Sequence, residues 1–315
     1  MSKIAFIYPG QGAQKAGMGV DFYENSEIAR YIFDQAGEEL DLDMKELCFE
    51  ENDRLDLTEY TQAAMVTTCL AMTRVAESKG LKADITAGLS LGEYPAIAAA
   101  GGMNDMDAIR LVRKRGILMQ NTVPAGEGAM CAVISMAAEE IEKVIEPIAD
   151  VSVANYNCPG QIVITGKTDA VEEAAVKLKE AGARRTIMLN VSGPFHSQML
   201  VPAGEKLAEE LEHTRFHELR IPYVTNVTAE KVTDIRETPG LLTTQISSPV
   251  RWMQSMERMI ADGVDTFVEI GPGKTLEGFL RKIDRSVKVF HISQWEDVDK
   301  VCTELADSGK MMEEA

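Results

Sequence analysis

The five residues 88–92, Gly-Leu-Ser-Leu-Gly, constrain the fold of this chain more than any other segment. They fit the pattern Gly-x-Ser-x-Gly, in which a sharp turn between a strand and a helix presents a serine hydroxyl as a nucleophile. The flanks suit this geometry, because residues 83–87 have the composition of a short buried strand and residues 93–100 that of a helix. Glycines at both ends let the strand and the helix approach each other closely, and the helix N-terminus directs free N–H groups toward Ser90. The alternative is a glycine-serine turn without chemistry.

Composition excludes several classes of protein. The chain has 315 residues, of which 45% are hydrophobic, enough for one large domain or two domains. No apolar run reaches 18 residues, so we expect no membrane span. The net charge of −18 argues against nonspecific nucleic-acid binding. The five cysteines are scattered without a Cys-x-x-Cys pair, which predicts neither zinc nor disulfides and favours a cytoplasmic protein.

The order of predicted elements indicates an α/β fold of two parts. Strand and helix patterns alternate over the first 120 residues, which is typical of a parallel sheet covered by helices. Residues 126–195 instead predict the order βαββαβ, the ferredoxin-like arrangement, with a turn at 157–160. We therefore expect an inserted small domain at 126–195 and a large α/β-hydrolase-like domain formed by 1–125 and 196–315.

A serine nucleophile needs a base, and the chain offers four histidines. His213 and His217 lie in a charged stretch typical of a solvated surface, and His291 lies in a strand pattern. His196 follows Gly193-Pro194 at the exit of the predicted small domain, where clefts commonly form. We favour His196 as the base, although a histidine at such a corner is often only a surface residue. No acid has a context that marks it as a third member, and a backbone carbonyl can also orient a histidine.

Two glycine-rich loops resemble nucleotide-binding motifs but fail at one position each. Gly10-Gln11-Gly12 begins a dinucleotide fingerprint whose third glycine is replaced by Lys15. Gly273-Lys274-Thr275 ends like a phosphate loop whose first glycine is replaced by Val268. We therefore expect no NAD or ATP.

Several motifs together resemble one family along nearly the whole chain, the malonyl-CoA:acyl carrier protein transacylases of bacterial fatty acid synthesis. They are the opening segment 6–14, the serine motif 88–94, Arg115-Gly116 with Met119-Gln120, the turn 155–161, Phe195-His196-Ser197, and the segments 245–252 and 269–274.

The resemblance implies a role for each matching position. Ser90 would carry the acyl group, and His196 would be its base. The backbone carbonyl of Gln245 would orient His196, and the backbone N–H groups of Gln11 and Leu91 would form the oxyanion hole. Arg115 would bind the free carboxylate of the malonyl group, a role that suits a planar guanidinium with two parallel donors. Without the resemblance, Arg110, Arg113, Lys114 and Arg115 read as a solvated basic helix face.

The chain departs from the family at two positions. Leu89 precedes the nucleophile where the family often has histidine. Phe195 precedes the base where many bacterial members have a small residue, and it resembles the malonyl-selecting acyltransferase domains of polyketide synthases. The bulk of Phe195 favours malonyl over methylmalonyl groups.

The implied reaction is malonyl transfer from malonyl-CoA to the phosphopantetheine thiol of acyl carrier protein, in fatty acid biosynthesis. It needs no metal or other cofactor, since coenzyme A and phosphopantetheine belong to the substrates. We expect a monomer without nucleic-acid or membrane partners. Because carrier proteins are acidic, basic side chains are candidates for docking them: Arg184, Arg185, Lys274, Arg281, Lys282 and Arg285.

Other readings stay open at this point. They are a serine hydrolase or thioesterase that uses water as acceptor, an acyltransferase of a polyketide pathway, and a non-catalytic subunit that keeps the fold.

Overall fold

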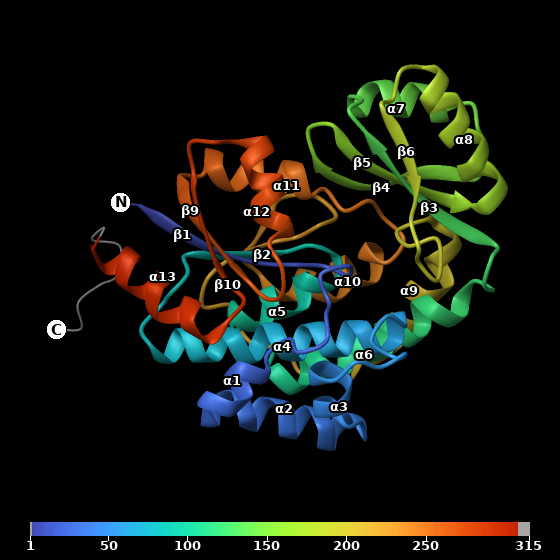
Figure 1. Ribbon diagram of the computed structural model, residues 1–315. Helices are drawn as coiled ribbons and strands as arrows, with labels where there is room; N and C mark the ends of the chain where they lie inside the picture. The colour runs from blue at the N-terminus through green and yellow to red at the C-terminus, as the bar shows by residue number, and fades with distance from the viewer. Residues whose placement is uncertain (1, 308–315) are drawn as a thin grey trace.

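The computed structural model describes residues 2–307 and contains a six-stranded and a four-stranded sheet (Figure 1). The large sheet has the order β10-β9-β1-β2-β7-β8, and its pairs are parallel except that of β8. Its strands are β1 Lys3–Tyr8, β2 Ile85–Gly88, β7 Tyr223–Val224, β8 Lys231–Val232, β9 Val264–Ile270 and β10 Lys288–Ile292. The prediction of an α/β fold with a parallel main sheet is therefore confirmed.

Strand β1 shows why both faces of this sheet are covered. Side chains alternate between the faces of a strand, and β1 is apolar on both. Ile4, Phe6 and Tyr8 join one buried apolar cluster, whereas Ala5 and Ile7 join another. Helices α11 Trp252–Ala261 and α12 Thr275–Ile283 supply the second cluster. The first cluster draws on α1 Val20–Asn25, α2 Glu27–Leu40, α3 Met44–Phe49, α4 Thr58–Ser78, α5 Glu93–Ala99, α6 Asp105–Thr122, α9 Val201–Glu212, α10 Thr238–Gln245 and α13 Trp295–Asp307.

The four-stranded sheet is antiparallel, with the order β4-β5-β3-β6. Its elements follow the predicted βαββαβ sequence: β3 Gly128–Ile134, α7 Ala138–Ile145, β4 Val151–Cys158, β5 Gln161–Lys167, α8 Thr168–Glu180 and β6 Arg185–Met188. One face packs on α7 and α8 through residues such as Val133 and Ile164. The other face carries Met130 and Val163 toward the main body of the protein.

The expected turn at 157–160 is only partly correct. Strand β4 continues through Asn157 to Cys158, which pairs with Gln161 and is buried. Only Pro159 and Gly160 form the turn, and Gly160 takes the left-handed conformation with a φ of 73°. Asn157 favours a turn locally. The strand conformation wins here because Cys158 pairs with Gln161 and both Asn157 and Cys158 become buried.

Pairing between β1 and β2 brings two loops together at the carboxyl edge of the large sheet. Tyr8 at the end of β1 lies opposite Gly88 at the end of β2. The loop after β1 then packs on the turn after β2, where a Cβ on Gly10 would come within 2.6 Å of the Leu89 side chain. The sheet therefore positions Gln11 next to the serine motif.

Candidate active site

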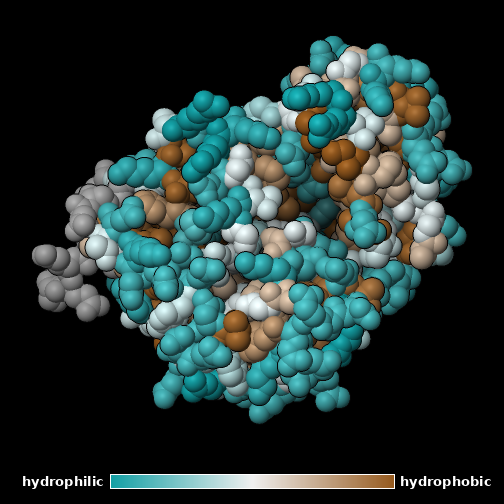
Figure 2. All heavy atoms as spheres, in the orientation of Figure 1, coloured by the Kyte–Doolittle hydropathy of each residue, from teal (hydrophilic) through white to brown (hydrophobic). Residues whose placement is uncertain are grey.

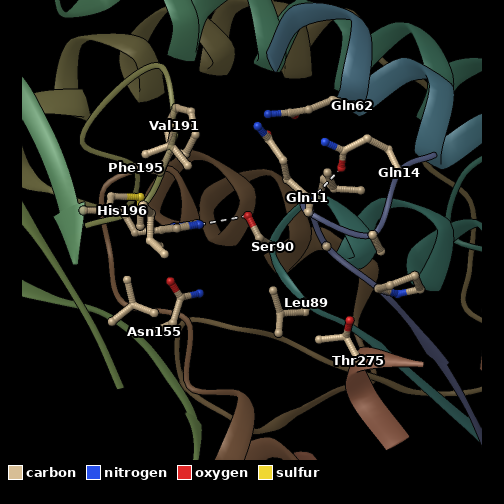
Figure 3. A pocket seen from close by; sticks show the side chains of 18 of the residues that line it. Gln11, Gln14, Gln62, Leu89, Ser90, Asn155, Val191, Phe195, His196 and Thr275 are labelled. Atoms are coloured by element: carbon tan, nitrogen blue, oxygen red, sulfur yellow. Dashed lines mark hydrogen bonds between the residues drawn. The ribbon is translucent and has the colours of Figure 1, made fainter. Parts of the chain in front are cut away.

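The serine motif forms a tight turn between β2 and α5, continued by the short 3-10 helix η1 Ser90–Gly92. Ser90 has a φ of 55°, in the left-handed region that residues other than glycine rarely adopt. A Cβ on Gly88 would lie 1.8 Å from the Gly92 carbonyl oxygen, so neither the strand nor the helix tolerates a larger residue there. The turn directs the Ser90 side chain into the cavity shown in Figure 3.

His196 is the partner of the serine. Ser90 Oγ lies 2.8 Å from His196 Nε2 (Figure 3), and His196 Nδ1 lies 2.9 Å from the Gln245 carbonyl oxygen. A carbonyl oxygen can only accept, so Nδ1 carries the hydrogen and Nε2 is left to accept the serine hydroxyl proton. His196 lies between β6 and the 3-10 helix η2 Gln198–Leu200, and it is 3% exposed rather than a surface residue.

The surroundings of His196 keep it neutral. Burial lowers its pKa to about 4, the nearby charge of Arg115 lowers it too, and the carbonyls of Gln245 and Ser248 act in the opposite direction. At neutral pH the imidazole can therefore accept a proton.

Arg115 is turned inward from α6 and is fully buried. It donates through NH1 to Gln62 Oε1 at 2.7 Å, and through NH2 to Ser90 Oγ and Gln245 Oε1, both at 3.0 Å. Burial lowers its pKa. Within residues 2–307, no carboxylate forms an ion pair with Arg115. Its Nε is buried and has no hydrogen-bond partner among these residues. A buried cation whose hydrogen-bond acceptors are all neutral is an attractive site for an anionic group.

The neighbouring cations of α6 each pair with an acidic side chain, but only Arg110 and Lys114 form the solvated basic face, because Arg113 is largely buried. Arg113 pairs with Glu59 at 2.9 Å, and Lys114 pairs with Glu210 at 3.4 Å. Arg110 pairs with Asp107. Only the fourth member of the run, Arg115, points to the serine.

The cavity around Ser90 measures about 720 Å³ and lies between the two sheets. The space-filling view shows the hollow between the two lobes (Figure 2). Its walls come from both parts of the chain, including Gln11, Leu89, Met119, Met130, Asn155, Val163, Leu189, Ser192, Phe195, Thr275 and Phe279. Both residues that depart from the family pattern, Leu89 and Phe195, thus face this cavity.

The two residues whose backbone N–H groups are expected to bind the oxyanion, Gln11 and Leu91, both line the cavity. Gln11 lies in the loop after β1, and Leu91 lies in the first turn of η1, where N–H groups have no intrahelical partner. The N–H of Ser90 itself is not available, because it donates to Asn226 Oδ1 at 2.7 Å.

Sequence reasoning missed three side chains of this network: Gln62, Glu93 and Asn226. Each is almost fully buried, and each bonds to Arg115, Ser90 or Gln245 across more than 50 residues of chain. The only signal in the sequence was a polar residue inside an apolar helix, as Gln62 is in α4.

The basic docking candidates fall into two groups. Lys274 directly precedes the cavity residue Thr275, and Arg281, Lys282 and Arg285 line a second hollow of about 610 Å³ at the other end of α12. Arg184 and Arg185 are exposed at the start of β6, whose far end leads to Leu189 in the cavity wall. The two groups thus lie on different lobes.

No group of three or more His, Cys, Asp or Glu side chains in residues 2–307 is arranged to hold a metal ion. Over the same residues, no helix is long and apolar enough to cross a membrane.

We predict that the His196 imidazole stays neutral, with its hydrogen on Nδ1, from pH 8 down to about pH 5. The cause is its pKa of about 4, which burial and Arg115 lower from the ordinary value of 6.5. Two-dimensional ¹H–¹⁵N spectra of the imidazoles measure this directly, with a His196→Gln spectrum to assign the signals. A titration midpoint above pH 6 would contradict the account.

Comparison with known proteins supports the same chemistry. The family model described as "Acyl transferase domain" matches residues 5–298. The malonyl CoA-acyl carrier protein transacylase of Bacillus subtilis is 44% identical over 304 residues, covering 95% of this chain and 96% of that protein. The crystal structure of the malonyl CoA-acyl carrier protein transacylase from Clostridium perfringens superposes with a TM-score of 0.94 at 42% identity, covering 98% of both chains.

A third relative was solved with a carrier protein. It is a malonyl-transacylase in complex with its type II PKS acyl-carrier protein, 35% identical with a TM-score of 0.93, covering 96% of this chain and all of that one. By sequence and by structure, the chain belongs to the acyl transferase domain family, among the malonyl CoA-acyl carrier protein transacylases.

Proposed function

We propose that this protein transfers the malonyl group of malonyl-CoA to the phosphopantetheine thiol of acyl carrier protein, in fatty acid biosynthesis. One observation carries the choice of acyl group: the buried Arg115 guanidinium lies 3.0 Å from Ser90 Oγ. An acyl group on Ser90 with a terminal carboxylate brings that carboxylate within reach of the guanidinium, so that an ionised acceptor replaces a neutral one. Acetyl groups lack this anchor.

In the first half-reaction, Ser90 Oγ attacks the thioester carbonyl and its proton passes to His196 Nε2. The distance of 2.8 Å between these atoms supports this transfer. The N–H groups of Gln11 and Leu91 stabilise the tetrahedral oxyanion. The C–S bond then breaks, and the sulfur of coenzyme A takes the proton from His196.

In the second half-reaction, the phosphopantetheine thiol gives its proton to His196 and attacks malonyl-Ser90. The bond between the acyl carbon and Ser90 Oγ breaks, and the serine recovers the proton. The Gln245 carbonyl stabilises the His196 imidazolium in both halves, because it accepts the Nδ1 hydrogen at 2.9 Å.

The organisation of the chain follows from the same proposal. Residues 126–195 form a small domain and 1–125 with 196–315 a large one, which the separate apolar cluster between the small sheet and its helices α7 and α8 supports. The protein acts as a monomer in the cytoplasm, without nucleic-acid or membrane partners. All residues of the proposed machinery come from one chain, and the five cysteines are free, which suits a reducing compartment. The bulk of Phe195 in the cavity wall disfavours methylmalonyl groups.

Incubation with malonyl-CoA should add one malonyl group to the protein, on the peptide that contains Ser90. Ser90→Ala should abolish the adduct, and His196→Ala should slow its formation by about 100-fold or more. Ser192→Ala is the matched control, because Ser192 lines the same cavity but bonds to Thr58. Intact-mass spectrometry measures the adduct. An adduct that survives Ser90→Ala, or one that water removes as fast as carrier protein does, contradicts the proposal.

The basic groups near the cavity provide the docking surface for the acidic carrier protein, and α12 contributes most because Lys274 adjoins the cavity. Combined reversal of Lys274, Arg281 and Lys282 to Glu should raise the KM for carrier protein about tenfold and flatten its salt dependence. Reversal of Arg184 and Arg185 should have a smaller effect. Lys300→Glu on α13, away from the cavity, is the control. Unchanged kinetics in both sets would show that docking occurs elsewhere.

A further inference from the structure

Glu93 is a buried carboxylate for which the reaction has no direct use. It is the first residue of α5, immediately after the serine motif, and its side chain is not exposed at all. Burial raises its pKa to about 7, whereas its hydrogen bonds and the nearby charge of Arg115 act in the opposite direction, and no cationic side chain within residues 2–307 pairs with it directly. Burying such a group without a cation costs stability. Its contacts explain why it is there.

Both hydrogen bonds of Glu93 Oε2 go to groups that hold the site together. Its Oε2 accepts the Gln245 side-chain N–H at 2.7 Å and the backbone N–H of Asn226 at 3.0 Å. Asn226 in turn bridges the serine turn, since it donates to the Gly88 carbonyl at 2.6 Å and accepts from the Ser90 N–H at 2.7 Å. One carboxylate oxygen therefore connects α10 and the loop after β7 to the nucleophile.

The contact with Gln245 decides which way the Gln245 amide faces. An amide keeps its shape when its oxygen and nitrogen exchange places, so only its partners fix its orientation. Here Nε2 meets two groups that accept, Glu93 Oε2 and the Ser90 carbonyl, the latter at 3.0 Å. The opposite atom, Oε1, must then face Arg115, from which it accepts at 3.0 Å. With the amide reversed, Gln245 Oε1 would face the Glu93 carboxylate oxygen, and the Gln245 N–H₂ group would face the N–H donors of Arg115.

We propose that Glu93 is a positioning residue for acyl-group selection: by accepting the Gln245 amide it fixes Gln245 Oε1 on Arg115, and so aims the guanidinium at the acyl group on Ser90. This inference rests on the proposed function and deepens it. Glu93 acts through the position of its acceptor oxygen rather than through its charge.

Two conservative variants separate position from charge. Glu93→Gln loses the charge but keeps an oxygen at the same reach, and its new N–H₂ group would face the Thr225 hydroxyl, which lies beside the carboxylate. Glu93→Asp keeps the charge but withdraws the oxygen by one methylene. The readout is the ratio of kcat/KM for malonyl-CoA to that for acetyl-CoA, with carrier protein as acceptor.

We expect Glu93→Asp to lower this ratio about tenfold or more, because Arg115 loses its fixed partner. Glu93→Gln should retain the ratio to within about threefold. The control is Glu269→Asp, which shortens another buried glutamate that accepts two backbone N–H groups, those of Leu276 and Glu277. That variant should lower thermal stability but leave the ratio unchanged.

The opposite order, with Glu93→Asp close to the wild-type ratio and Glu93→Gln impaired, would overturn the inference in favour of a charge effect. Parallel loss of both activities would reduce Glu93 to a structural role. If Glu93→Asp does not fold, Glu93→Gln still decides, since a lost ratio in that variant contradicts the inference. The wild type is assayed alongside. If it forms no malonyl-serine, the proposed function fails and the inference with it. Normal wild-type transfer with an unchanged Glu93→Asp ratio overturns the inference alone.

Discussion

The site depends on one buried positive charge. Arg115 is fully buried, and its hydrogen-bond acceptors are the Gln62 and Gln245 amides and the Ser90 hydroxyl. Burying a guanidinium costs free energy that neutral oxygens recover only in part. A carboxylate ligand therefore gains more here than at a guanidinium already paired with an acid. The fold supports this arrangement by bringing α4, α6, α10 and the serine turn to one point, so that all three acceptors come from elements packed in the same apolar cluster.

The same charge accounts for the form of the catalytic pair. A carboxylate at His196 Nδ1 would add a negative charge to a site in which the positive charge of Arg115 already acts on His196. The Gln245 carbonyl orients the imidazole without adding a negative charge. In addition, the charge of Arg115 disfavours the imidazolium, and together with burial it lowers the pKa of His196 to about 4. Gln245 thus serves both partners, His196 through its backbone and Arg115 through its side chain.

Local sequence predicted the parts of the site that local geometry determines. The serine turn was predictable because Gly88 and Gly92 approach each other closely. This approach requires glycine at both positions, and both lie within one five-residue motif. The βαββαβ order was predictable because the spacing of apolar residues differs between strands and helices and can be seen within each segment. The end of β4 was not, because Cys158 is placed by pairing with Gln161 rather than by the turn tendency of its neighbours.

Long-range contacts explain what sequence patterns did not show. The basic run from Arg110 to Arg115 gives no sign of which member turns inward, and the resemblance to a family singled out Arg115 where the charge pattern favoured a solvated face. Glu93, Asn226 and Gln62 were missed because their partners are distant in the chain, as with Glu93 and Gln245, 152 residues apart.

Whether Arg115 selects the acyl group by its charge can be measured with an isosteric pair of substrates. Acetoacetyl-CoA has nearly the shape of malonyl-CoA but ends in a methyl ketone instead of a carboxylate. Rapid-quench mass spectrometry gives the second-order rate constant for acylation of Ser90 by each compound. We expect malonyl-CoA to react about 100-fold faster, as two charge-assisted hydrogen bonds would allow, and we expect Arg115→Ala to remove most of this difference. Equal rates for the two compounds with the unaltered protein would contradict this expectation.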